Sequence, residues 1–170
     1  MDIISEAIRI SSAITNESPK EWLPPAEGTE SKSEAIVYKP LVRGTRGYIE
    51  KISNQINGCY ENGWYDACAV MIRRLVETLL IEVFESRGIE NKIKKNGDYM
   101  FLRDMIGITL AENSLNLSRN ARQSLPKLKD VGDKSAHSRR FNAIRHDIDE
   151  IRPDLRFIIQ EMLSIAKIKN

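Results

Sequence analysis

The chain has 170 residues, of which 41% are hydrophobic and 29% are charged, and its formal net charge is +2. This composition is typical of one globular domain and excludes an intrinsically disordered chain. The longest unbroken apolar run, residues 67–72, is much shorter than the roughly 20 residues of a membrane span. The first residues also lack the features of a secretory signal. We therefore expect a cytoplasmic protein without a membrane partner.

The residue types that hold metals or perform nucleophilic catalysis are scarce in this sequence. Cys59 and Cys68 lack the CxxC spacing of zinc and redox sites and cannot form a disulfide framework. His137 and His146 are the only histidines, which excludes a site built from several histidines. Glycine motifs that cradle phosphates, HExxH and the nucleophile elbow are absent. We therefore predict no metal and no cofactor, and interpret both cysteines as small core residues.

The N-terminal quarter of the chain differs in composition from the rest. Apolar residues in 1–14 have a spacing that is compatible with a short helix. Residues 15–44 contain several prolines and a polar run, which predicts an extended, irregular arm. Trp22 and Tyr38 indicate that parts of this arm dock on something. We therefore place a helix and arm in the first 44 residues and a helical bundle in 45–170.

From Thr45 onward, apolar residues recur at intervals of three and four, which is the spacing of amphipathic helices. These stretches predict helices over 48–60, 64–87, 101–110, 118–131 and 148–166. A lysine-rich connector is expected over 91–98. No stretch alternates with period two, and no Asn-Gly pair is flanked by β-branched runs, so no strands are expected. The fold class that follows is all-α, an antiparallel bundle of four to five main helices.

Three features define the ends and interruptions of these helices. The 64–87 segment is apolar on both sides, which predicts a central helix that Gly88 terminates. Ser118 is a plausible N-cap for the next long helix, and Pro126 must either kink that helix or begin a new segment. Pro153 is expected either in the first turn of the last helix or after a short separate turn.

Positive charge is concentrated between Arg119 and Arg145. This segment contains eight basic residues and two acidic ones, a net charge of +6, so the rest of the chain sums to −4. Such a concentration is typical of a surface that binds a polyanion. The alternative interpretation is a solvated helical face whose acidic partners come from elsewhere in the fold.

Residues 132–140, with the sequence GDKSAHSRR, form the one constellation that suggests chemistry. If the helix continues through it, Asp133 and His137 share a face at positions i and i+4. A histidine poised near neutrality moves protons, and nearby cations stabilise the charge that develops at a reacting phosphate. The alternative is that His137 ends the helix, bonds backbone carbonyls and fixes the following loop.

Charged residues also interrupt the otherwise apolar 64–87 helix. Arg73 and Glu77 are correctly spaced for an internal salt bridge, and we interpret Arg73, Arg74, Glu77 and Asp133 as a structural polar network. The functional alternative is an arginine that faces a phosphate. His146, beside Asp147 at the start of the last helix, is interpreted as part of a surface cap.

Two sequence blocks resemble the DUF4145 branch of the HEPN superfamily. The blocks read NGCYENGWYDACAVMIRRLVE at residues 57–77 and GDKSAH at residues 132–137, and the resemblance extends over roughly 45–167. It implies an antiparallel helical bundle that often forms a homodimer through the face bearing the histidine motif. Such domains are common in prokaryotic restriction, toxin–antitoxin and anti-phage systems. Many are metal-independent endoribonucleases whose motif places an Arg before the His, with four to six residues between them.

The sequence keeps only His137 of that motif. The positions for the Arg, 130–132, hold Asp, Val and Gly, and Lys129 lies one residue too far away. A Gly before the His is the pattern of the DUF4145 branch, whose members look more like non-catalytic binding modules. The resemblance therefore implies a module that binds RNA or DNA, or a nucleic-acid-processing partner. The expected basic surface consists of Lys129, Lys134, Arg139, Arg140 and Arg145.

Two other functions remain open from the sequence. One is a metal-independent endoribonuclease that uses His137, with Lys134 or an Arg from elsewhere replacing the missing Arg. The other is a protein-interaction or antitoxin-like dimer module, in which the 15–44 arm wraps a partner and Trp22 is the anchor.

Overall fold

The computed structural model describes Ile4, Glu6 and residues 34–168. The chain divides into two compact units, 1–30 and 31–170, and the second contains nearly all of the described residues. Apart from Ile4 and Glu6, the predicted N-terminal helix lies outside the described residues, and so does Trp22.

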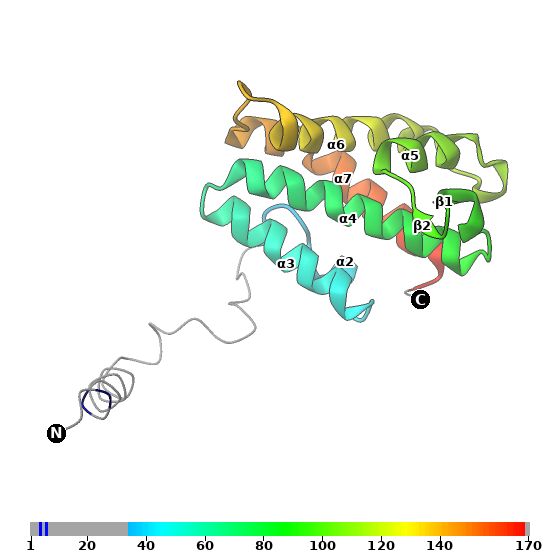
Figure 1. Ribbon diagram of the computed structural model, residues 1–170, viewed down its shortest axis with the longest axis horizontal. Helices are drawn as coiled ribbons and strands as arrows, with labels where there is room; N and C mark the ends of the chain where they lie inside the picture. Colours follow the sequence, from blue (N-terminus) through cyan, green and yellow to red (C-terminus); the bar gives the residue numbers. More distant parts are fainter. Residues whose placement is uncertain (1–3, 5, 7–33, 169–170) are drawn as a thin grey trace. The chain divides into compact units, whose positions relative to one another are not determined.

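The second unit is an all-α helical bundle, as predicted, with one very short hairpin (Figure 1). In chain order its elements are α2 (Lys39–Val42), α3 (Gly47–Glu61), α4 (Tyr65–Ser86), the 3-10 helix η2 (Glu90–Ile93), β1 (Lys94–Lys95), β2 (Asp98–Tyr99), α5 (Leu102–Ala111), the 3-10 helix η3 (Asn113–Leu115), α6 (Arg119–His137) and α7 (Arg145–Ala166). No helix among the described residues is long and apolar enough to cross a bilayer.

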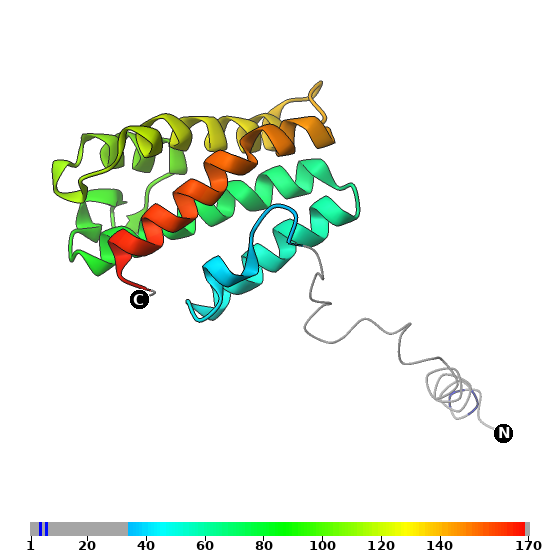
Figure 2. The same cartoon turned by 180° about the vertical axis from the view of Figure 1, so that it is seen from behind.

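Helix α4 is the central helix of the bundle, as its apolar pattern predicted. It packs extensively against α3, α6 and α7 and less against α5. Figure 1 shows α4 between α3 and α6, and Figure 2 shows α7 crossing it on the opposite face. Because α4 is covered from several directions, it contributes more fully buried apolar residues than any other described helix: Cys68, Ala69, Ile72, Leu75, Val76, Leu79, Leu80, Val83 and Phe84.

The C-termini of α3 and α4 end in the same left-handed glycine motif. Gly63 has a φ of +74° and Gly88 a φ of +65°, a conformation that is strained for residues with a Cβ. After α3, the amide of Trp64 donates to the carbonyl of Cys59 at 2.8 Å, and the Gly63 amide donates to Tyr60 at 3.1 Å. These two bonds are those of a Schellman motif. The prediction that Gly88 ends the central helix is confirmed.

Neither proline breaks the helix in which it lies. α6 runs without interruption through Pro126, so no new helix begins there. The expectation for Pro153 is wrong, because this residue lies in the interior of α7 and not in its first turn. An interior proline costs a helix about 3 kcal/mol. The buried side chains of Ile151 and Leu155, on either side of Pro153, contribute about 1.5–3 kcal/mol each and offset that cost.

The connector over 91–98 contains a hairpin that was not predicted. Lys94 pairs with Tyr99 and Lys95 with Asp98, in antiparallel register. Asn96 and Gly97 both have positive φ, 55° and 93°, which is the geometry of a type I′ turn. The Asn-Gly pair was the available signal, but it is flanked by two lysines and by Asp98 and Tyr99, and not by the β-branched residues that usually accompany a strand.

Residues 34–44 pack on the bundle, although the sequence places them in an irregular arm. Ile36 and Val37 are completely buried, and Val42 is nearly so. Tyr38, which was expected to dock, is 45% exposed. The segment therefore docks through its aliphatic residues, and the bundle begins earlier than the predicted boundary after residue 44.

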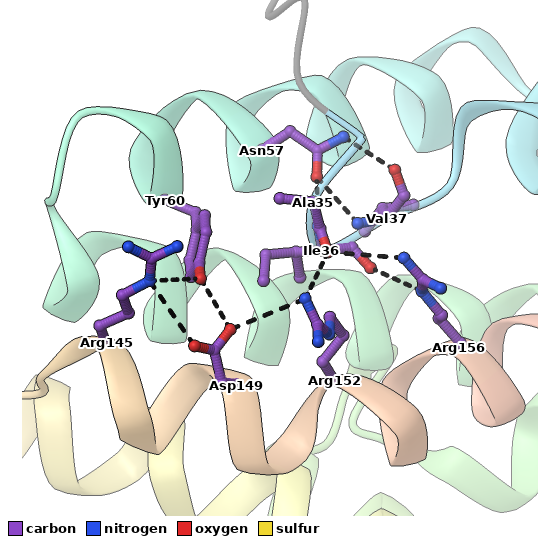
Figure 3. A network of polar contacts seen from close by, with 9 residues as sticks. All are labelled: Ala35, Ile36, Val37, Asn57, Tyr60, Arg145, Asp149, Arg152 and Arg156. Carbon is purple, nitrogen blue, oxygen red and sulfur yellow. Dashed lines mark hydrogen bonds and ion pairs between the residues drawn. The ribbon is translucent and has the colours of Figure 1, made fainter.

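Polar side chains from α3 and α7 hold this segment in place (Figure 3). The Oδ1 atom of Asn57 accepts hydrogen bonds from the amides of Ile36 (3.2 Å) and Val37 (2.8 Å), and its Nδ2 donates to the Val37 carbonyl at 2.8 Å. From α7, Arg152 and Arg156 donate to backbone carbonyls of the same segment at 3.4–3.5 Å. A buried asparagine thus satisfies backbone groups that would otherwise be unpaired.

Candidate nucleic-acid interface

The histidine motif lies at the end of the bundle where two connections meet. The α3–α4 turn and the connection 138–144 between α6 and α7 lie at the same end in both views (Figures 1 and 2). A hydrogen bond from the Ala143 amide to Asp66 Oδ1, 2.8 Å long, joins this connection to the first turn of α4. The last turn of α6 is therefore held beside the start of α4.

Helix α6 carries the motif to this end without a break. The Ser118 hydroxyl caps its N-terminus by accepting from the Ala121 amide at 3.1 Å, as predicted. Glu161 of α7 in turn accepts from the amide and hydroxyl of Ser118, at 2.8 and 2.7 Å. The helix ends at His137, which is exposed, so Asp133 and His137 do occupy positions i and i+4 of one helix.

The Asp133 carboxylate nevertheless faces other partners. Arg73 Nε donates to its Oδ1 at 2.7 Å, and Lys129 Nζ lies 2.7 Å from its Oδ2. Burial alone would raise the pKa of Asp133, but the hydrogen bonds from Lys129 and Arg73 outweigh it and hold the pKa below its ordinary value. This carboxylate is ionised and already engaged, and its described contacts do not include His137.

The polar network of α4 is joined through Arg73. Its guanidinium lies 3.6 Å from Glu77 on the same helix and bonds to Asp133 on α6. Arg74 points away from this network: it is exposed, and within the described part of the chain its side chain has no ion pair. The network therefore joins α4 to α6 and leaves Arg74 on the surface.

At Gly132 helix α6 lies close against α4. A Cβ atom at this position would lie 2.6 Å from the Cβ of Arg73 and 3.0 Å from the carbonyl oxygen of Ala69. The second contact is with backbone and cannot be relieved by a side-chain rotation. The glycine before the histidine motif is thus required by helix packing, and it positions Arg73 against Asp133.

The eight basic residues between 119 and 145 fall into two groups. Four have partners: Arg122 donates to backbone carbonyls, Lys127 pairs with Asp154, Lys129 pairs with Asp130 and Asp133, and Arg145 contacts Tyr60 and Asp149. The other four, Arg119, Lys134, Arg139 and Arg140, are exposed and have no ion pair with a described residue.

Three of these unpaired cations gather around the end of α6. Lys134 lies in its last turn with His137, and Arg139 and Arg140 follow in the connection to α7. Arg119 lies at the opposite end of the helix. We call Lys134, His137, Arg139 and Arg140 the basic end. Lys129 does not belong to it, because this lysine is only 16% exposed and is held between two carboxylates.

Arg145 takes part in a separate network at the start of α7 (Figure 3). Its Nε donates to the Tyr60 hydroxyl at 2.9 Å, and its guanidinium lies over the Tyr60 ring, 5.4 Å from the centroid. The same hydroxyl donates to Asp149 at 2.7 Å. The contact with Tyr60 raises the pKa of Arg145, which therefore remains charged and joins α7 to α3.

His146 lies next to this network but does not cap α7. The cap is made by Asp147, whose Oδ2 accepts from the Ile144 amide at 2.8 Å. His146 itself is exposed at the second position of the helix. Asp147 thus makes the cap that was expected of His146 and Asp147 together. A carboxylate is favoured at the N-terminus of a helix.

Two exposed apolar side chains at this end were missed by the sequence analysis. Trp64 is 62% exposed directly before α4, and Ile144 is similarly exposed directly before α7. Trp64 was interpreted as the first residue of an amphipathic helix, where a large ring is usually buried. The available signal was its place immediately after the Asn62-Gly63 turn, outside the helical stripe.

A hollow of about 380 Å³ lies at the other end of α4. Its lining includes Glu82, a buried carboxylate whose pKa is raised by burial and whose nearest cation is Arg46, 3.7 Å away. The histidine motif is not part of this lining. Across residues 34–168, no cluster of three or more His, Cys, Asp or Glu side chains is arranged to hold a metal ion.

A scan against protein-family models, a search of curated proteins and a search of solved structures each found no match. The candidate interface therefore rests on the geometry and charge of this chain.

Proposed function

We propose that this chain is a non-catalytic, HEPN-like helical module that binds nucleic acid in a prokaryotic defence or nucleic-acid-processing system. The basic end contacts the phosphate backbone. The observation that carries the proposal is the separation of the basic residues: Lys134, Arg139 and Arg140 are exposed and unpaired together, whereas most others in the segment already have a partner.

The basic residues of this segment give up different contacts when a phosphate binds. A phosphate that approaches Lys129 or Lys127 must compete with a carboxylate that is already in contact. At Arg139 and Arg140 it displaces only water and mobile counterions, whose release favours binding. A guanidinium also presents a planar fork of donors that matches two phosphate oxygens.

Binding without cleavage is supported by the surroundings of His137. The three positions where a catalytic Arg is expected hold Asp130, Val131 and Gly132. Asp133, the nearest carboxylate on the same helix face, is occupied by Arg73 and Lys129 and does not orient the imidazole. A general base works best when a partner fixes the position of its proton, and the described contacts of Asp133 do not supply that partner to His137.

The test measures the affinity for labelled RNA and DNA oligonucleotides by fluorescence anisotropy over a series of salt concentrations. A plot of log affinity against log salt has a negative slope. We expect Arg139→Ala/Arg140→Ala to make this slope shallower by about 1.4–1.8, because each lost phosphate contact contributes about 0.7–0.9. The matched control is Arg119→Ala/Lys127→Ala, which removes the same charge from the other part of α6 and is expected to leave the slope nearly unchanged.

Three results contradict the proposal. The first is wild-type protein that binds neither RNA nor DNA at low salt, which favours the protein-interaction alternative. The second is a control variant that loses as much affinity as the double arginine variant, since net charge alone then explains binding. The third is metal-free cleavage of RNA that His137→Ala abolishes, which supports the endoribonuclease alternative.

A further inference from the structure

Trp64 presents a large aromatic ring on the surface from a backbone that is held in place. Its ring is 62% exposed, although tryptophan usually contributes its large apolar area to a core or an interface. Its backbone is held on both sides: the amide donates to Cys59 at 2.8 Å, and the carbonyl accepts from Cys68 at 2.9 Å. The ring therefore extends from a backbone that is held in place at the junction between α3 and α4.

The neighbouring aromatic rings are already engaged. Tyr65 packs edge-on against Tyr60 with ring centroids 5.8 Å apart, and Arg145 covers the Tyr60 ring. In the part of the chain that the structure describes, Trp64 has no such ring or cation partner. Its π-face remains open for a ligand.

This open ring and the basic end lie at the same end of the bundle. Asp66, in the first turn of α4, bonds to Ala143 in the connection that carries Arg139 and Arg140. Both views place the α3–α4 turn and this connection at that same end of the bundle (Figures 1 and 2). An aromatic ring beside unpaired cations is the combination with which proteins hold single-stranded nucleic acid.

We infer that the basic end selects single-stranded over duplex nucleic acid, and that a base stacks on the Trp64 ring while Arg139 and Arg140 bind the flanking phosphates. The inference rests on the proposed function and specifies its ligand. In a duplex both faces of each interior base are covered by its neighbours, so the ring gains nothing from it. In a single strand every base offers a π-face, whatever the sequence.

The experiment uses the full chain in a Trp22→Phe background, which leaves Trp64 as the only tryptophan. The probes are oligo(U), oligo(dT) and a hairpin duplex with the same number of phosphates. Binding of either single strand is expected to change Trp64 emission, and the duplex is expected to bind more weakly with little change in emission.

Trp64→Ala is expected to weaken single-strand binding roughly 5- to 150-fold, the contribution of one stacked base, with an unchanged salt slope. Trp64→Phe should restore part of the loss.

Phe101→Ala is the matched control, because this ring is 81% exposed at the start of α5. It is expected to leave the affinity unchanged. If Trp64→Ala binds like wild type while Arg139→Ala/Arg140→Ala does not, stacking is refuted and the proposed function stands. The inference is also overturned if the duplex binds as tightly as the single strands, or if Trp64 emission does not change when a single strand binds. Absence of binding to every probe overturns both proposals.

Discussion

The Asp133 carboxylate is bonded to cations of two helices, and its described contacts do not include His137. It is half-buried between α4 and α6 and receives one cation from each helix, Arg73 and Lys129. A carboxylate with two charge-assisted hydrogen bonds is stabilised in its ionised form, which is why its pKa is lowered despite burial. It therefore stabilises the fold and leaves His137 to the surface.

This role predicts a pH-dependent stability difference between wild type and Asp133→Asn. Because the pKa of Asp133 is lower in the folded than in the unfolded state, its contribution is fully present above about pH 4, the ordinary carboxyl pKa. It is lost as the pH falls through the lower, folded-state pKa. We expect Asp133→Asn to lower the free energy of unfolding by about 1–3 kcal/mol at pH 7, and this difference to vanish at the acidic end of a series of urea unfolding curves.

Asp130→Asn is the control, because Asp130 is exposed and its one ion pair with a described residue is with Lys129. Its effect is expected to stay below about 0.5 kcal/mol at every pH, as is usual for a surface ion pair. A difference between wild type and Asp133→Asn that persists unchanged at the lowest pH shows that the asparagine distorts the site by some other means.

At the scale of elements, the contact between α4 and α6 depends on a glycine. Gly132→Ala places a Cβ 3.0 Å from the Ala69 carbonyl, so the two helices must separate. We expect this variant to lose about 1–3 kcal/mol of unfolding free energy, the usual effect of overpacking. Gly107→Ala is the matched control, since nothing lies within 4 Å of its added Cβ on α5. It is expected to gain about 0.5–1 kcal/mol from helix propensity. Equal changes in the two variants would show that the close approach at Gly132 is unimportant.

The helices could be predicted wherever their signal lies in neighbouring residues of the sequence. Helix spacing is local, and so are the caps at Ser118 and Gly88, whose residue types favour those positions for reasons of backbone geometry. Pro153 was assigned wrongly because its helix is retained by packing, which its immediate neighbours in sequence do not reveal.

The candidate site was less predictable, because its outcome depends on contacts between distant residues. The sequence places Lys129 and Arg139 in one basic segment, but only the fold shows that the first is held by carboxylates and the second is not. Asn57 was not singled out, since its partners lie about twenty positions earlier in the chain. The exposure of Trp64 likewise follows from the turn geometry and not from helical periodicity.

At the scale of the molecule, the bundle separates its polar functions along α4. The end at Trp64 carries the basic end, whereas the hollow at the other end is lined by two carboxylates and two cations: Glu82, Glu85, Arg46 and Lys167. In that hollow the two carboxylates share the lining with two cations, whereas the cations of the basic end have no ion pair with a described residue. Residues 34–44, where the second unit's described structure begins, do not line this hollow except at Gly44.

Truncation of the chain tests where this unit begins. Deletion of residues 1–43 removes Ile36, Val37 and Val42, whose buried side chains contribute at most about 5–9 kcal/mol together. That is comparable to the whole stability of a typical domain, about 5–15 kcal/mol, so we expect this product to be unfolded or aggregated. Deletion of residues 1–33 keeps all three and the Asn57 hydrogen bonds, and is expected to unfold in one cooperative thermal transition followed by circular dichroism. If both truncations unfold cooperatively at the same temperature, residues 34–43 do not belong to the core; if neither folds, the unit needs residues that precede position 34.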